Sequence, residues 1–198
     1  MSSAATGPEP DEPRKRGLLE AAITVFMRFG YRKTSMDEVA RAAQVSRQAL
    51  YLHFANKEDL FRAAVKQVLE GSLQAAVQAA RDPQLSVDQK LVRVFDAWMG
   101  RYVGMHGSGA SDLAEAAGTL VGPLYAEHET QFTELLAKII GSAGLATAYR
   151  PAGLTARQLA EILYATARGL KHSSPSREAF TRSMTVAVKA LCLPLGGF

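Results

Sequence analysis

T-S-M-D-E-V-A-R-A-A-Q-V-S-R-Q-A-L-Y-L-H-F-A-N-K-E-D-L, at residues 34–60, indicates the fold, because it reads as two short helices followed by the start of a longer one. Thr34 and Ser35 each precede a carboxylate by three residues, the spacing at which the two groups cap a first helical turn. A first helix is therefore expected here. Its inward stripe consists of apolar residues at three and four spacing, namely Met36, Val39, Ala40 and Ala43.

A second short helix is predicted directly after the first. Ser46 can cap it, and Leu50 and Phe54 lie one turn apart, so that they can be buried together. The opposite face presents hydrogen-bonding side chains to solvent: Arg47, Gln48 and Tyr51. Arg and Gln make bidentate contacts with guanine and adenine edges in the major groove of DNA, which admits a helix. The pattern predicts a helix-turn-helix, although a solvated amphipathic helix in an ordinary bundle would show the same outward face.

This region resembles the DNA-binding domain of the TetR family, the tetracycline-repressor-like transcriptional regulators. The resemblance covers Leu18 to Leu60 and is carried by A-A-I-T-V-F-M-R-F-G-Y at 21–31, T-S-M-D-E-V-A at 34–40 and V-S-R-Q-A-L-Y-L-H-F-A-N-K-E-D-L at 45–60. It implies an all-α chain of about nine helices, in which a three-helix helix-turn-helix domain precedes a larger helical domain for effector binding and dimerisation.

The resemblance also implies roles for residues near the second short helix. Base contacts are expected from Arg47 and Gln48. Phosphate contacts are expected from Tyr51, His53 and Lys57. Further hydroxyl or backbone contacts to phosphate are expected from three residues at helix starts: Thr34, Ser35 and Ser46.

Three positions depart from the family's usual pattern. Gln48 stands where a small residue is common, and Ala49 stands where a Thr or Ser is common. One hydroxyl contact to phosphate is therefore expected to be missing, and Gln48 is expected to read a base instead. Leu52 stands where a polar or aromatic residue is common. Because of these three residues, we expect this chain to read a different DNA sequence from its relatives.

The placement of charge agrees with DNA binding. The whole chain has a formal net charge of +4. From Arg14 to Lys57 there are nine Lys and Arg against three Asp and Glu, a net charge of +6, so the basic excess belongs to the helix-turn-helix region. Such an excess is expected of a surface that neutralises phosphates and releases counterions.

The expected domain organisation has three parts. Residues 1–13 are polar and Pro-rich without periodicity, and are predicted to be a disordered tail. The cluster at 14–16 either contacts the DNA backbone or minor groove or is an ordinary solvated charge run. The DNA-binding domain is placed at 14–60, and the helical effector-binding and dimerisation domain at 61–198. The first helix should end at Gly30 and carry an apolar face of Leu18, Leu19, Ala22, Ile23, Phe26 and Phe29.

The second domain is predicted to be helical throughout. A long helix is expected from Lys57 to about residue 80. A loop follows at 104–111, then a short helix at 112–119. A new helix is expected from V-G-P at 121–123, since proline is common at helix starts.

An effector pocket is expected among the aromatic and histidine residues of this domain, because ligand pockets are mostly apolar with a few placed polar groups. The candidates are Trp98, Met99, Tyr102, His106, Tyr125, His128 and Phe132. Any one of them could equally be plain core. The resemblance implies a small-molecule effector, and the aromatic character favours a hydrophobic or aromatic one.

The last two predicted helices carry apolar faces that could pack on a second copy as a four-helix interface. The candidate residues are Leu159, Ile162, Leu163, Thr166, Leu170, Phe180, Met184, Val188 and Leu191. Packing within the chain is the alternative, and both can hold on different faces. A homodimer is favoured because one short recognition helix reads few bases, whereas a two-fold dimer reads a palindromic operator.

Catalytic, metal and cofactor sites find no support in the sequence. It has no Gly-rich phosphate loop and no nucleophile motif, and its four histidines are scattered, so no catalytic residue, metal or cofactor is expected. Cys192 is single and is expected to be a small buried residue. Without a signal peptide or an apolar run of about 18 residues, a soluble cytoplasmic protein with no membrane partner is expected.

The sequence therefore predicts a homodimeric, ligand-responsive transcriptional regulator, a repressor released from a palindromic operator by a small-molecule effector. Two alternatives stay open. One is an architectural DNA-binding protein without an effector, and the other is a helix-turn-helix fused to an enzymatic or carrier helical domain.

Overall fold

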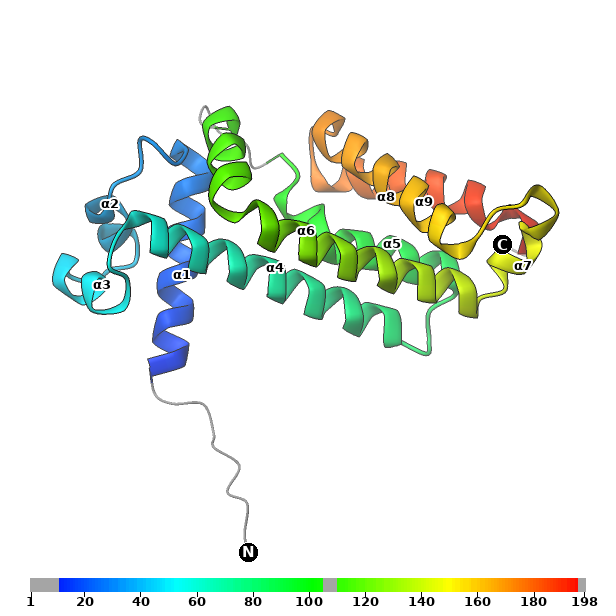
Figure 1. Cartoon of the computed structure of the whole chain (residues 1–198), viewed down its shortest axis with the longest axis horizontal. Coiled ribbons are helices and arrows are strands. Elements are labelled where there is room, and N and C mark those ends of the chain that lie inside the picture. Colours follow the sequence, from blue (N-terminus) through cyan, green and yellow to red (C-terminus); the bar gives the residue numbers. More distant parts are fainter. Residues whose placement is uncertain (1–10, 105–109, 196–198) are drawn as a thin grey trace, which may run out of the picture. The chain divides into compact units, whose positions relative to one another are not determined.

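The computed structural model describes residues 11–104 and 110–195, and all regular elements in this part of the chain are helical. Its nine α-helices (Figure 1) are α1 (Asp11–Phe29), α2 (Met36–Ala42), α3 (Arg47–His53), α4 (Lys57–Arg81), α5 (Val87–Met99), α6 (Ala110–Ser142), α7 (Leu145–Ala148), α8 (Ala156–Ser173) and α9 (Arg177–Cys192). Short 3-10 segments lie at Gly100–Tyr102, Arg150–Ala152 and Leu193–Leu195. The predicted all-α fold of about nine helices is confirmed over these residues.

The described residues form two compact units. The first unit contains residues 11–68 and 110–122, and the second contains residues 69–104 and 123–195. Helices α4 and α6 each contribute residues to both units. The first unit therefore contains the predicted helix-turn-helix region together with the first turns of α6.

The start of α1 differs from the predicted tail at 1–13. Residues 1–10 lie outside the described part of the chain, and α1 already begins at Asp11. A proline in the first helical turn is tolerated there, because the first N–H groups of a helix have no intrahelical partner to lose. The helix ends before Gly30, whose φ of 86° places it in the left-handed region that favours glycine at a helix end.

The core of the first unit is built from α1 and the helices that follow it. Phe26 and Phe61 make an edge contact with ring centroids 5.0 Å apart. Four residues of the predicted face of α1 are buried: Leu18, Leu19, Ala22 and Phe26. Phe29 is exposed and Ile23 is only half-buried, whereas Val25 is buried, so those two positions of the predicted face were wrong.

Helix α6 corrects the prediction of two helices at 112–119 and from 121–123. It runs unbroken from Ala110 to Ser142 with Pro123 in its interior. An interior proline costs a helix about 3 kcal/mol. Buried residues flank it on both sides, among them Val121 and Phe132, and their packing outweighs that cost. Of the loop predicted at 104–111, residues 105–109 lie outside the described part.

The second unit is a helical layer in which α5 packs against α9, and α9 against α8. Its core contains large, fully buried side chains from these helices and from α6: Phe95, Leu91, Phe132, Phe180 and Met184. Cys192 is also buried, and burial raises the pKa of its thiol to about 11.

Over the described residues, no helix combines the length and apolar character needed to cross a membrane.

Candidate nucleic-acid interface

Side-chain caps fix the first turns of α2 and α3. The hydroxyl of Ser35 accepts a hydrogen bond from the backbone N–H of Glu38 at 3.2 Å, and the carboxylate of Glu38 accepts from the N–H of Ser35 at 2.7 Å. This reciprocal cap selects one of the two predicted pairs. The hydroxyl of Ser46 caps α3 by accepting from the N–H of Ala49 at 3.1 Å. Gln44, with a φ of 56°, lies in the turn between the helices.

Thr34 holds the loop before α2. Its hydroxyl donates a hydrogen bond to the carbonyl oxygen of Gly30 at 2.7 Å, and only 2 % of the residue is exposed. A hydroxyl that is buried and already bonded to the backbone has no surface to offer to a phosphate. The hydroxyl of Thr34 therefore has a structural role, and of its two expected contacts with phosphate only the one through the backbone stays a prediction.

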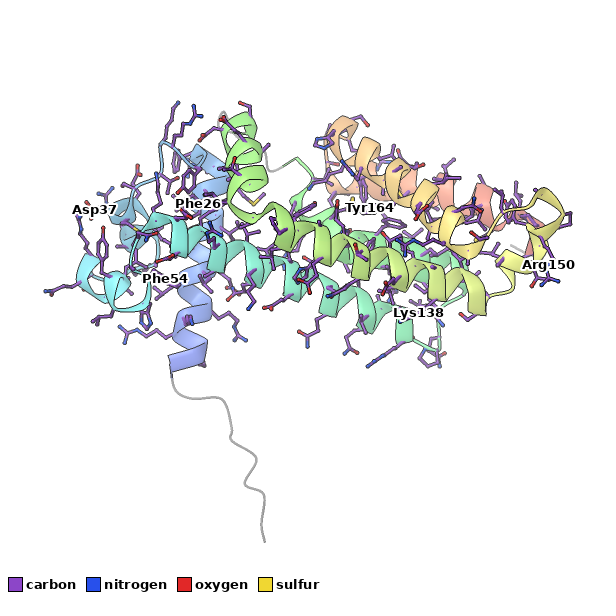
Figure 2. The ribbon with its side chains drawn as sticks, in the orientation of Figure 1. Phe26, Asp37, Phe54, Lys138, Arg150 and Tyr164 are labelled. Atoms are coloured by element: carbon purple, nitrogen blue, oxygen red, sulfur yellow. The ribbon has the colours of Figure 1, made fainter. Side chains whose placement is uncertain are left out.

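One side of helix α3 is buried in the first unit, and the opposite side is exposed to solvent. Leu50 and Phe54 are buried, as predicted, and Figure 2 shows Phe54 directed into the first unit. Arg47 and Gln48 are exposed on the other side of the helix, and Tyr51 is 40 % exposed. The structure thus brings the two predicted base readers and one predicted phosphate contact to the same outer face.

Arg47 is held in place by weak, exchangeable contacts. Its guanidinium donates to the carboxylate of Asp37 at 3.0 Å and lies 5.4 Å from the ring centre of Tyr51. Asp37 lies at the outer side of α2 (Figure 2). An exposed ion pair of this kind contributes at most about 1 kcal/mol, so a base or phosphate can replace the carboxylate.

Lys57 is turned inward more than expected. Its ammonium donates to the carbonyl oxygens of Tyr31 at 3.0 Å and Arg32 at 3.4 Å, and lies 4.5 Å from the ring centre of Tyr31. An ammonium has three N–H donors, and two of them are engaged here. Lys57 therefore ties the loop after α1 to the start of α4, a positioning role that the sequence did not reveal.

The remaining candidate positions of the first unit are Leu52, His53 and its exposed cations. Leu52, which departs from the family pattern, is 85 % exposed beside the outer face of α3. His53 is half-buried next to the ring of Phe54. The exposed cations of this unit are Arg14, Arg16, Arg28, Arg32, Lys33, Arg41, Arg47, Arg62 and Lys66.

Four of the seven residues of the predicted effector pocket are buried in the second unit: Trp98, Met99, His128 and Phe132. Trp98 stacks on Phe132 with ring centroids 4.7 Å apart, and Met99, the next residue after Trp98, is buried. His128 is buried too, and one of its ring nitrogens, Nδ1, lies 2.9 Å from the carbonyl oxygen of Leu124. The indole and phenyl rings of this set thus form core, which was the alternative interpretation.

The other candidates of that set are not part of the buried core that the structure describes. Tyr102 is half-buried in a 3-10 segment, Tyr125 is 38 % exposed, and His106 lies outside the described residues. An open pocket of about 480 Å³ is present on the second unit, but its lining contains none of the seven candidates. That lining consists of Asp96, Arg177, Glu178, Thr181, Arg182 and Thr185. In the part of the chain that the structure describes, no cluster of His, Cys, Asp and Glu could hold a metal ion.

The predicted dimer residues divide between two faces. Five of them are buried within the chain itself: Leu159, Leu163, Phe180, Met184 and Val188. These five cannot form an outer surface, so the intramolecular alternative is correct for them. Leu170 and Leu191 are half-buried, whereas Ile162 is 58 % exposed and Thr166 is exposed.

The sequence prediction named Ile162 and Thr166 but none of the other exposed residues of the last two helices, because it followed the strongest apolar stripe. The exposed positions on α8 include Ile162, Ala165, Thr166 and Gly169. Those on α9 and the segment after it include Val186, Ala190 and Leu193. A second stripe of small and apolar residues at three and four spacing was the available signal, and it lies opposite the buried one.

Comparisons with known proteins agree with the site. Residues 18–64 match the family described as "Bacterial regulatory proteins, tetR family". The chain is 38 % identical over 84 residues to the HTH-type transcriptional regulator YhgD of Bacillus subtilis, covering 42 % of this chain and 44 % of that protein. It is 32 % identical over 84 residues to the probable acrEF/envCD operon repressor of Escherichia coli, covering 39 % and 37 %.

The matches to curated relatives span less than half of those relatives' length. The solved structure of the fatty acid degradation regulator FadR from Bacillus halodurans is similar over nearly the whole chain. It has a TM-score of 0.62 and 19 % identity, and covers 98 % of both chains. This likeness concerns the fold alone.

Proposed function

We propose, from the match of residues 18–64 to the tetR family of bacterial regulatory proteins, that this chain regulates transcription. It binds DNA in a sequence-specific manner, as a repressor that a small-molecule effector releases from a palindromic operator. The observation that carries the proposal is the outer face of α3. A helix held by Leu50 and Phe54 presents Arg47 and Gln48 together, and these side chains match the hydrogen-bonding edges of guanine and adenine.

The division of labour within the interface follows from exposure. Arg47 and Gln48 read bases, and Tyr51 contacts phosphate at the edge of the same face. The exposed N-terminal turns of α2 and α3, capped by Ser35 and Ser46, offer backbone N–H groups to phosphate oxygens. The exposed cations of the first unit add sequence-independent attraction that weakens with salt.

A homodimer supplies the second recognition helix. We propose that the outer stripes of α8 and α9 pack on their copies in a second chain. Ala165 and Gly169 let helices approach closely, while Ile162, Val186 and Leu193 provide apolar area that is largely exposed in the single chain. This replaces the buried residues first expected at the interface.

The dimer proposal predicts that Ala165→Glu dissociates the protein. A carboxylate in the middle of a close helix contact would be buried without a partner, and we expect the dimer to weaken by at least about tenfold. Sedimentation equilibrium measures the change. Ala126→Glu places the same charge on the exposed side of α6 and should leave the mass unchanged. A dimer of undiminished stability in Ala165→Glu would place the interface elsewhere.

Two helices connect effector binding to the DNA-binding unit in this proposal. Helix α4 begins at Lys57, which bonds to the loop before α2. Two acidic residues in the first two turns of helix α6 bond to the same loop. Asp112 accepts from the backbone N–H of Arg32 at 2.7 Å, and Glu115 accepts from its guanidinium through both oxygens at 2.9 Å. Both helices continue into the second unit, so a change there alters the separation of two recognition helices.

A footprint on the promoter next to the protein's own gene tests the proposed function. We expect protection of an inverted repeat whose half-site centres are about one helical turn, or a multiple of it, apart. Adding the effector should remove the protection. Protection that spreads without sequence preference and responds to no compound would instead indicate an architectural protein.

A further inference from the structure

A chain of polar contacts lies in the second unit between α6 and α8. The hydroxyl of Tyr164 donates to the carboxylate of Glu129 at 2.5 Å. The ring of Tyr164 lies 5.7 Å from that of Phe132, which stacks on Trp98. Figure 2 shows Tyr164 between the ribbons of these two helices. A carboxylate thus sits directly beside an aromatic core, and its hydrogen-bonding capacity is partly used by the tyrosine.

Two cations belong to the same cluster. Arg168 and Lys171 follow Tyr164 by four and seven residues, so the three share one stripe of α8. Burial is the main cause that lowers the pKa of Lys171, Arg168 lowers it further, and Glu129 raises it. The cluster therefore has one half-buried carboxylate and two cations, the half-buried Lys171 and the exposed Arg168, which leaves a surplus positive charge.

The cluster is also reached by solvent. Tyr125 lies one turn before Glu129 on α6 and is 38 % exposed, yet burial is the main cause that raises the pKa of its phenol. Part of the Tyr125 side chain is therefore exposed to solvent, while protein surrounds its hydroxyl. The apolar ring of Tyr125 thus stands beside the surplus charge with its surface still available for contact.

We propose that this cluster binds the effector, and that the effector is an organic carboxylate. Its carboxylate pairs with Lys171 and Arg168, and its apolar body lies against the rings of Tyr125 and Tyr164. Pairing a half-buried ammonium with an opposite charge offsets the cost of its desolvation. The inference rests on the proposed function, since it names the chemical class of the molecule that releases the DNA. It also narrows the expectation of a hydrophobic or aromatic effector.

The fluorescence of Trp98 provides a direct test, because this is the single tryptophan of the chain and lies one ring away from the cluster. The full-length protein is titrated with benzoate, 4-phenylbutyrate and decanoate, and with primary amines of the same carbon skeletons. We expect saturable changes in fluorescence with at least one carboxylate and with none of the amines. Lys171→Gln and Arg168→Gln should each weaken that binding by about tenfold or more.

Lys138→Gln is the matched control, since this lysine is exposed on α6 and lies outside the cluster (Figure 2). It should bind as the unchanged protein does. Circular dichroism of both cluster variants verifies their folding. The proposal is overturned if amines bind as well as carboxylates, if no carboxylate binds, or if neither variant weakens binding. Binding to DNA without any ligand is measured in parallel, so a failure of the proposed function is seen separately from a failure of this site.

Discussion

Arg47→Ala is expected to lower affinity for the operator by about 5- to 150-fold, the equivalent of about 1–3 kcal/mol for a bidentate base contact. The side chain is exposed, and its ion pair with Asp37 contributes little to folding, so the variant should keep its structure. The loss should concentrate at particular base pairs. Binding to duplexes that are changed one position at a time measures it.

Arg41→Ala is the control for Arg47→Ala. Arg41 is an exposed cation in the last turn of α2, so its removal takes the same charge from the same unit. We expect a small loss that is equal on every duplex and a salt slope shallower by at most about one unit. If Arg47→Ala also weakened all duplexes equally, Arg47 would be a phosphate contact, and base reading would have to come from Gln48.

Phe132→Ala should lower the free energy of unfolding of the second unit by about 3–5 kcal/mol. Phe132 is fully buried and contacts the rings of Phe95, Trp98 and Tyr164 at centroid distances of 4.7–5.7 Å. Its removal leaves a cavity that these rings fill only partly. Urea unfolding followed by the fluorescence of Trp98 gives the change in this unit.

Phe29→Ala is the matched control, because Phe29 is an exposed phenylalanine at the end of α1. It should cost less than about 1 kcal/mol. A loss of similarly small size in Phe132→Ala would mean that the ring lines a cavity with room to collapse. That result would restore Phe132 as a pocket residue and count against its assignment to the core.

Local chemistry made the first unit predictable. The helix starts follow from hydroxyl caps: Ser35 forms a reciprocal cap with Glu38 at α2, and Ser46 caps α3. Gly30 ends α1 as expected, since glycine adopts the left-handed conformation at little cost. The face of α3 also followed, because Leu50 and Phe54 are the only strongly apolar pair one turn apart there.

The features that the sequence did not predict depend on contacts that form only in the folded chain. Pro123 is a local signal for a helix start, but packing on both sides of it keeps α6 continuous. Thr34 and Lys57 carry groups suited to phosphate, and only the folded loop shows that both engage backbone carbonyl groups. Periodicity finds the apolar face of α9 but does not say what covers it. Residues such as Phe180 were therefore assigned to a dimer contact, although the chain buries them itself.

Selection of bound duplexes from a pool of random sequence tests the central claim most directly. After several rounds with the full-length protein, we expect the sequenced pool to converge on an inverted repeat, and the same selection with Arg47→Ala to relax particular positions in each half. A pool that stays random after selection, although the protein retains duplexes on the filter, would contradict sequence-specific recognition by α3.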